Sequence, residues 1–197
     1  RGGCNGARIR FSPESDWDSN TGTTDAFSTL ESVKSSFPAV SYADLIVLAG
    51  QTAVEAAGGT AMQFCAGRTD AFDAAGSAKL EPRYYEPAVI SIRDNMQVKG
   101  LKPQEGVALF ARPGANGTLS NKYFEDLKAG NGEFNEEERA LLQAEFLTIV
   151  DSFIADNEAF LVTFATAWTY TMTADRFAGP ANNICEDVDT STLEGDG

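Results

Sequence analysis

The sequence predicts an all-α domain, and three observations indicate this fold class. Apolar residues recur at helical spacing in seven stretches, whereas the alternating pattern of a half-buried strand is nearly absent. A chain of 197 residues suits one domain with a substantial core. No apolar run approaches the roughly 18 residues needed to cross a bilayer, so no transmembrane segment is expected. We predict one domain over residues 1–177, followed by an acidic flexible tail over 178–197.

Two helices are predicted in the first third of the chain. Residues 1–22 are rich in glycine and polar residues, as is typical of loops, and the alternating segment 7–11 is either a short strand or irregular. A first helix is predicted over 24–36. The second, over 42–57, begins after Ser41 and is apolar on nearly all sides. Such a helix is normally buried, so we expect the others to pack around it.

Four polar residues stand out around this second helix. Ser41 and Asp44 form a pattern similar to a capping box, with Asp44 near the positive end of the helix dipole. The long loop over 60–86 is of a length that is usually functional in a compact domain. It contains Arg68 and Asp70. We expect Arg68 to clamp the loop through a carboxylate or backbone carbonyls, and Asp70 to bind either Arg68 or backbone amides.

The remaining helices are predicted from periodicity and from their end signals. The predicted ranges are 87–99, 103–110, 120–128, 135–155 and 158–173. The longest has Asn135 as its cap and three glutamates in its first turn, where the helix dipole favours negative charge.

The composition excludes several classes of function. The net charge of −14 repels phosphate backbones, so no nucleic-acid role is expected, while the acidic surface or tail suits a protein partner. The chain contains no His, which excludes imidazole as a base, an acid or a metal ligand from these residues. Cys4, Cys65 and Cys185 are isolated in the sequence, so a zinc site is not expected.

Three stretches, FPAVSYADLIVLAG at 37–50, FCAGRTD at 64–70 and GTLSNKYFEDL at 117–127, together resemble the class I branch of the plant-type haem peroxidase superfamily. This branch contains ascorbate, cytochrome c and catalase-peroxidases. The opening segment RGGCNGARIR is similar to the C-terminal domain of catalase-peroxidases, a haem-less duplicate that supports its partner domain. The residues that match family landmarks are Ser41, Asp44, Arg68, Asp70, Asn121 and Trp168.

The resemblance also implies what this sequence lacks. Active members bind haem iron through a proximal His that follows a VALSGGHT-like helix. Here the segment 107–109 matches the start of that helix, but the chain reaches Gly117 a few residues later. We interpret the helix that bears the proximal His as deleted, and the sequence shown does not contain the distal helix. Glu138 corresponds to the carboxylate that orients the His, and we interpret it here as helix-start charge. No haem and no catalytic or metal-binding residues are expected.

Three functional hypotheses follow. The first is a haem-less, inactive peroxidase-like protein acting as a structural or interaction subunit; its acidity also resembles that of a haem-less ascorbate-peroxidase-like protein of the chloroplast thylakoid lumen, near photosystem II. The second is part of an active haem peroxidase that removes hydrogen peroxide, with the catalytic residues outside this stretch. The third is a small-molecule binder, or a thiol-redox protein using Cys65, for which a buried inert thiol is the alternative. Acid–base catalysis by Asp44, Glu55 or Asp70 has no specific support.

Overall fold

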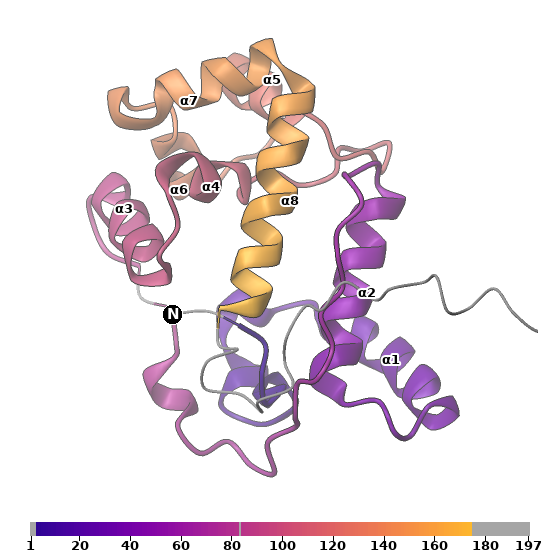
Figure 1. Ribbon diagram of the computed structural model, residues 1–197. Helices are drawn as coiled ribbons and strands as arrows, with labels where there is room; N and C mark the ends of the chain where they lie inside the picture. The colour runs from indigo at the N-terminus through magenta and orange to yellow at the C-terminus, as the bar shows by residue number, and fades with distance from the viewer. Residues whose placement is uncertain (1–2, 83, 175–197) are drawn as a thin grey trace, which may run out of the picture.

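The computed structural model describes residues 3–82 and 84–174, which form a helical fold (Figure 1). The α-helices are α1 Thr24–Ser36, α2 Tyr42–Ala56, α3 Ala88–Lys99, α4 Pro103–Ala108, α5 Lys122–Ala129, α6 Glu136–Ala140, α7 Ala144–Ala155 and α8 Asn157–Thr173. Short 3-10 helices occupy the connections: η1 Arg8–Arg10, η2 Glu14–Asp16, η3 Asp18–Asn20 and η4 Ser77–Lys79. Extended pairing in the described ranges is limited to an isolated bridge between Gly6 and Asp70. The prediction of an all-α fold is confirmed.

Helix α8, rather than α2, lies at the centre of the fold. Figure 1 shows α8 running between the helices α3 to α7 on one side and α2 on the other, and α8 packs against α4 and α7. The main buried cluster includes Ile92, Met96, Val107, Leu119, Phe124, Leu127, Leu141, Phe146, Val150, Phe153, Phe160 and Phe164. Helix α2 reaches this cluster through the partly buried Val54, and its Leu48 is 41% exposed.

The expectation that α2 forms the buried centre is therefore wrong. The buried apolar residues of α2 are Ala43, Leu45 and Val47. The opposite face owes its apolar character largely to alanines such as Ala53 and Ala56, which are exposed. Exposing a small side chain costs little, so an Ala-rich pattern does not require that every face be covered.

A close approach between α2 and α8 depends on a glycine. A Cβ atom built on Gly50 would lie 2.9 Å from Cζ2 of Trp168, closer than real Cβ contacts. The Trp168 ring also stacks on Phe164, with ring centroids 6.1 Å apart and an angle of 17° between the planes. The glycine therefore lets the indole of α8 lie directly against α2.

The predicted long helix over 135–155 is two helices. Asn135 does cap the first, because its side chain accepts a hydrogen bond from Glu138 N at 2.8 Å. The chain then leaves the helical conformation at Gln143, which is extended with φ −74° and ψ 155°. The break lets α6 pack against α3 while α7 packs against α4 and α5. One straight helix could not follow both directions.

The alternating segment 7–11 is a 3-10 turn and not a strand. Ala7 has a left-handed backbone with φ 45°, and η1 follows it. Arg10 folds back, donating from Nε to Ala7 O at 3.0 Å and from Nη2 to Ala71 O at 2.9 Å. Arg10 therefore binds backbone carbonyls instead of lying on one face of a pleated strand.

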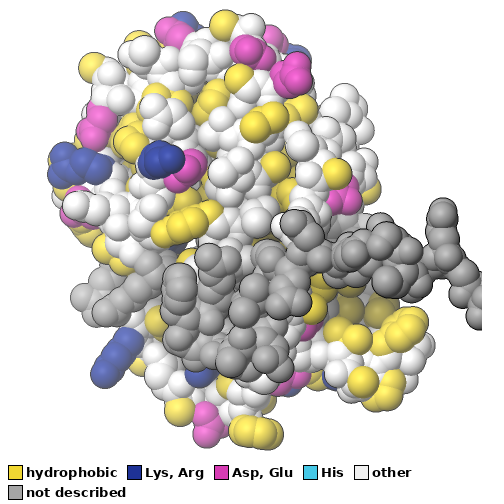
Figure 2. All heavy atoms as spheres, viewed as in Figure 1, with side chains coloured by type: hydrophobic (Ala, Val, Ile, Leu, Met, Phe, Trp, Pro, Cys, Tyr) yellow, Lys and Arg dark blue, Asp and Glu magenta, His cyan; other side chains and the backbone are white. Residues whose placement is uncertain are grey.

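Helix α1 packs against α2 but contributes no buried residue. Val33 is 38% exposed and Phe37, just after the helix, is 60% exposed. Figure 2 shows hydrophobic side chains gathered around this corner of the molecule, at the lower right. No helix in the described part of the chain is long and apolar enough to cross a membrane. The predicted tail over 178–197 and the domain end at 177 lie outside the described residues.

Candidate functional site

A buried ion pair joins α2 to the loop that follows it. Arg68 Nη1 lies 3.0 Å from Asp44 Oδ1, and the two residues are 3% and 8% exposed. Asp44 Oδ2 accepts a second hydrogen bond from Gly67 N at 2.9 Å. Ser41 caps α2, accepting from Asp44 N at 3.0 Å, as predicted. The Asp44 carboxylate does not complete a capping box, because it faces the loop instead.

Arg68 also binds two backbone carbonyls. Its Nη2 donates to Met172 O at 2.8 Å, and its Nη1 donates to Cys65 O. Met172 lies in the last turn of α8, so the guanidinium links α2, the loop and α8. The predicted clamp is confirmed, and it uses both a carboxylate and carbonyls. Cys65 is buried, as the alternative to a thiol-redox role expects, but it is disulfide-bonded and is not a free thiol.

Asp70 caps the start of α2 from outside the helix. Its Oδ2 accepts from Tyr42 N and its Oδ1 from Ala43 N, both at 2.9 Å. These amides are among those that a helix start leaves without partners. Of the two alternatives predicted for Asp70, backbone amides are right. Gly6 fastens the same loop, because its N donates to Thr69 O at 2.7 Å.

The other two landmarks belong to different junctions. Asn121 Nδ2 donates to Phe153 O at 3.1 Å and to Ile154 O at 2.9 Å, which ties the start of α5 to the end of α7. Trp168 lies on α8 beside Gly50. The structure therefore brings Ser41, Asp44, Arg68 and Asp70 together, whereas these two residues hold the helical bundle.

A second buried polar cluster, centred on Glu138, was not predicted. Glu138 is 6% exposed and accepts from Tyr123 OH at 2.8 Å and from Asn135 N at 2.8 Å. It also forms an ion pair with Arg112, whose guanidinium lies 5.3 Å from the centroid of the Tyr123 ring. The interpretation of Glu138 as helix-start charge alone is therefore incomplete. The spacing from Asn135 to Glu138 indicates a capping box, but nothing in the sequence indicates Arg112 as the partner.

The Tyr123 hydroxyl gives this cluster a dependence on alkaline pH. Burial raises the pKa of Tyr123 to about 12 from 10.0, and the nearby Arg112 acts in the opposite direction. Because the folded state holds this proton more tightly, its stabilising effect is complete below pH 10 and is lost as the pH rises through 12. We expect the free energy of unfolding to fall over this range, and to fall less steeply in Tyr123→Phe. Urea unfolding at several pH values measures this, and equal slopes would contradict it.

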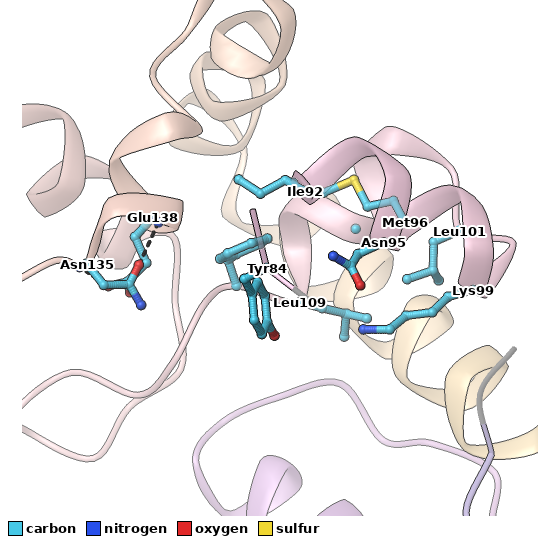
Figure 3. A pocket seen from close by; sticks show the side chains of 11 residues that line it. Tyr84, Ile92, Asn95, Met96, Lys99, Leu101, Leu109, Asn135 and Glu138 are labelled. Atoms are coloured by element: carbon cyan, nitrogen blue, oxygen red, sulfur yellow. Dashed lines mark hydrogen bonds between the residues drawn. The ribbon is translucent and has the colours of Figure 1, made fainter. Parts of the chain in front are cut away.

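A groove lies beside Glu138, made of two adjoining cavities. The inner cavity, of about 330 Å³, lies between α3, α4 and α6 and is shown in Figure 3. The outer cavity, of about 670 Å³, opens towards η2 and η3. Tyr84, Phe110 and Asn135 line both. The described residues contain no group of three or more His, Cys, Asp or Glu side chains suited to a metal ion.

The protein is thus a helical domain in which Asp44, Arg68 and Asp70 fasten the loop after α2 to α2 and α8. Residues 1–112, more than half of the chain, match the model of the peroxidase family. A catalase-peroxidase of Pseudomonas putida is 36% identical over 90% of this chain and 32% of its own length. The mitochondrial cytochrome c peroxidase of Aspergillus fumigatus is 40% identical over 55% of this chain and 30% of its own length. The chain belongs to the peroxidase family, and these relatives support a relationship to the class I haem peroxidases.

The comparisons also bear on the missing segment. The chain spans about a third of the length of the curated relatives that it matches most completely. The alignment with the P. putida protein extends over 244 residues, and that with a catalase-peroxidase of Legionella pneumophila over 255, although this chain has 197. The relatives therefore carry residues inside the matched region that this chain lacks, which agrees with a truncated domain.

Proposed function

We propose that this chain is a haem-less, catalytically inactive member of the peroxidase family that acts as a structural or interaction subunit of a larger complex. The observation that carries the proposal is that none of its 197 residues is a His. Active class I members, which the sequence resembles, bind haem iron through a proximal His. The frame that the family landmarks build is retained, while the residue that would bind iron is absent.

The residues present do not fit haem. Helix α4 ends at Ala108, and the chain then turns back, with Leu119 N donating to Ala57 O at 2.8 Å. Glu138, the counterpart of the carboxylate that orients the proximal His, is bound by Tyr123 and Arg112. Cys65 is disulfide-bonded, so its thiolate is not free to serve as an iron ligand.

The interaction role is supported by charge. A net charge of −14 favours association with a basic protein surface and disfavours binding to nucleic acid. The partner and the compartment are part of the proposal, and the chloroplast thylakoid lumen near photosystem II is one location that fits an acidic, haem-less relative of ascorbate peroxidase.

A haem titration tests the proposal. Increasing haem is added to the purified chain while the Soret absorbance and the melting temperature are recorded, with apomyoglobin as the positive control. We expect weak, non-saturating absorbance, no peroxidase activity above that of free haem, and no rise in melting temperature. A Soret band that saturates at one haem per chain, with a raised melting temperature, would refute the proposal.

A second candidate is part of an active haem peroxidase whose catalytic residues lie outside this stretch. It is favoured by the coverage of the catalase-peroxidases, of which this chain matches 32% and 34% of the length. The intact mass of the protein isolated from its natural source distinguishes the two. A mass near 21.0 kDa supports the first proposal, and a mass several tens of kilodaltons larger supports the second.

A further inference from the structure

The inner end of the groove is the more apolar of the two. The cavity of about 330 Å³ is lined by Ile92, Met96, Leu101 and Leu109, with Lys99 as the basic residue in its described lining. Figure 3 shows Tyr84 between Leu109 on one side and Asn135, the cap of α6, and Glu138 on the other. Cavities of this size and composition are typical of sites that take one apolar group. Asn95 and Asn135 also line this cavity, and Glu138 already has its partners, so the four apolar side chains form the contact surface for an apolar group.

The outer end of the groove is acidic and aromatic. Its walls carry the carboxylates of Asp16, Asp18, Glu81 and Glu137, together with the indole of Trp17. None of these four carboxylates forms an ion pair with another described residue, in contrast to Glu138. The hydroxyls of Ser12 and Ser15 donate to the Asp16 carboxylate and lower its pKa.

Carboxylates and aromatic rings in one cavity favour the same kind of ligand group. A Lys or Arg side chain is attracted by the carboxylates and by the faces of aromatic rings such as Trp17. Tyr84, which lines both cavities, is 59% exposed, so the groove is open to solvent where the two cavities meet. An open groove with an apolar end and an acidic end suits an extended segment of protein better than an enclosed small molecule.

We propose that this groove binds a segment of a basic protein partner, with an apolar side chain in the inner cavity and a Lys or Arg side chain at the acidic end. The inference rests on the proposed role as an interaction subunit and identifies the surface and the chemistry of the partner. Charge complementarity speeds such encounters and sets their orientation, while burial of the apolar side chain adds affinity that salt does not screen.

A fluorescein-labelled peptide of sequence GKKLFKKG tests the proposal by fluorescence anisotropy with the full chain. Two further peptides are compared: GEELFEEG reverses the charge, and GKKGSKKG removes the apolar residues. We expect saturable binding of the first peptide alone. Two-dimensional NMR supplies the position, because the chain has two Trp and Trp17 lines the groove. The indole N–H signal of Trp17 should shift on binding, and that of Trp168 should not.

Matched variants distinguish binding in the groove from attraction by the net charge of the chain. Asp18→Asn with Glu81→Gln should weaken binding by about fivefold, as expected for two partly exposed charge pairs. Glu145→Gln with Glu158→Gln changes the net charge equally outside the groove, and should leave the dissociation constant nearly unchanged. Tyr84→Ala should weaken binding, whereas Tyr85→Ala, whose hydroxyl binds Asp94, should not.

Three outcomes would overturn the inference: no saturable binding of GKKLFKKG, equal binding of GKKGSKKG, or equal weakening by both pairs of acidic substitutions. The last two would mean long-range attraction without a site. The haem titration is independent of these measurements. A chain that bound haem stoichiometrically and also bound the peptide would refute the proposed function and leave the groove, and the reverse result would leave the proposed function without this surface.

Discussion

Replacing Asp44 by Asn is expected to lower the free energy of unfolding by about 3–5 kcal/mol, because it leaves a buried guanidinium without its counter-charge. The Arg68 side chain is 0% exposed, so water cannot solvate the charge that remains. The substitution keeps the size of the side chain. The amide group also turns a donor towards a site where Gly67 N and Arg68 Nη1 both donate. The expected loss is a large share of the stability of an ordinary domain.

Urea unfolding followed by circular dichroism measures this loss. The control is Asp151→Asn, which removes an exposed ion pair with Lys128, the two side chains being 46% and 49% exposed; we expect a loss below about 1 kcal/mol. Adding Arg68→Leu to Asp44→Asn removes the uncompensated charge, so the double variant should lose less than the sum of the single ones. A loss in Asp44→Asn no larger than in Asp151→Asn would show that the pair is not a structural clamp.

The helices could be predicted where the signals are local. Periodicity and caps placed α1, α3 and α8 within two residues of their observed ends, and Asn135 was correctly predicted as a cap. Such signals act within one turn of the chain, so a single sequence contains them. The break at Gln143 was missed because it follows from α6 and α7 packing against different helices, and the periodicity continues through it.

The site could be predicted only in part. The sequence predicts that Arg68 binds a carboxylate or backbone carbonyls, and it offers both Asp44 and Asp70 as carboxylates. Only the folded loop shows that Asp44 pairs with Arg68 while Asp70 caps α2. Arg112 and Glu138 are separated by 26 positions, and no periodic signal connects residues so far apart. The groove could not be predicted for the same reason, because its walls come from loops and helices that are far apart in the sequence.

The second large effect is expected from Phe124→Ala, which should lower the free energy of unfolding by about 3–5 kcal/mol. The Phe124 side chain on α5 is 0% exposed, and its ring lies 5.4 Å from that of Phe153 on α7 and 5.3 Å from that of Phe160 on α8. These three helices cannot easily move together to fill the resulting cavity. Asn121 binds the carbonyls at the end of α7 and so fixes the position of α5 relative to α7.

Phe72→Ala is the matched control, because Phe72 is 98% exposed and the same substitution there should change the stability by less than about 0.5 kcal/mol. Equal small losses in both variants would show that the aromatic cluster packs loosely. The hydrogen-bond partners of Asp44, Gly67 and Arg68, are not among the rings that Phe124 contacts, so the effects should add when Phe124→Ala is combined with Asp44→Asn. Additivity would mean that the retained peroxidase frame is stabilised independently by a polar clamp and by an aromatic core. Both would then act through contacts between residues of this chain alone, as the proposed structural role requires.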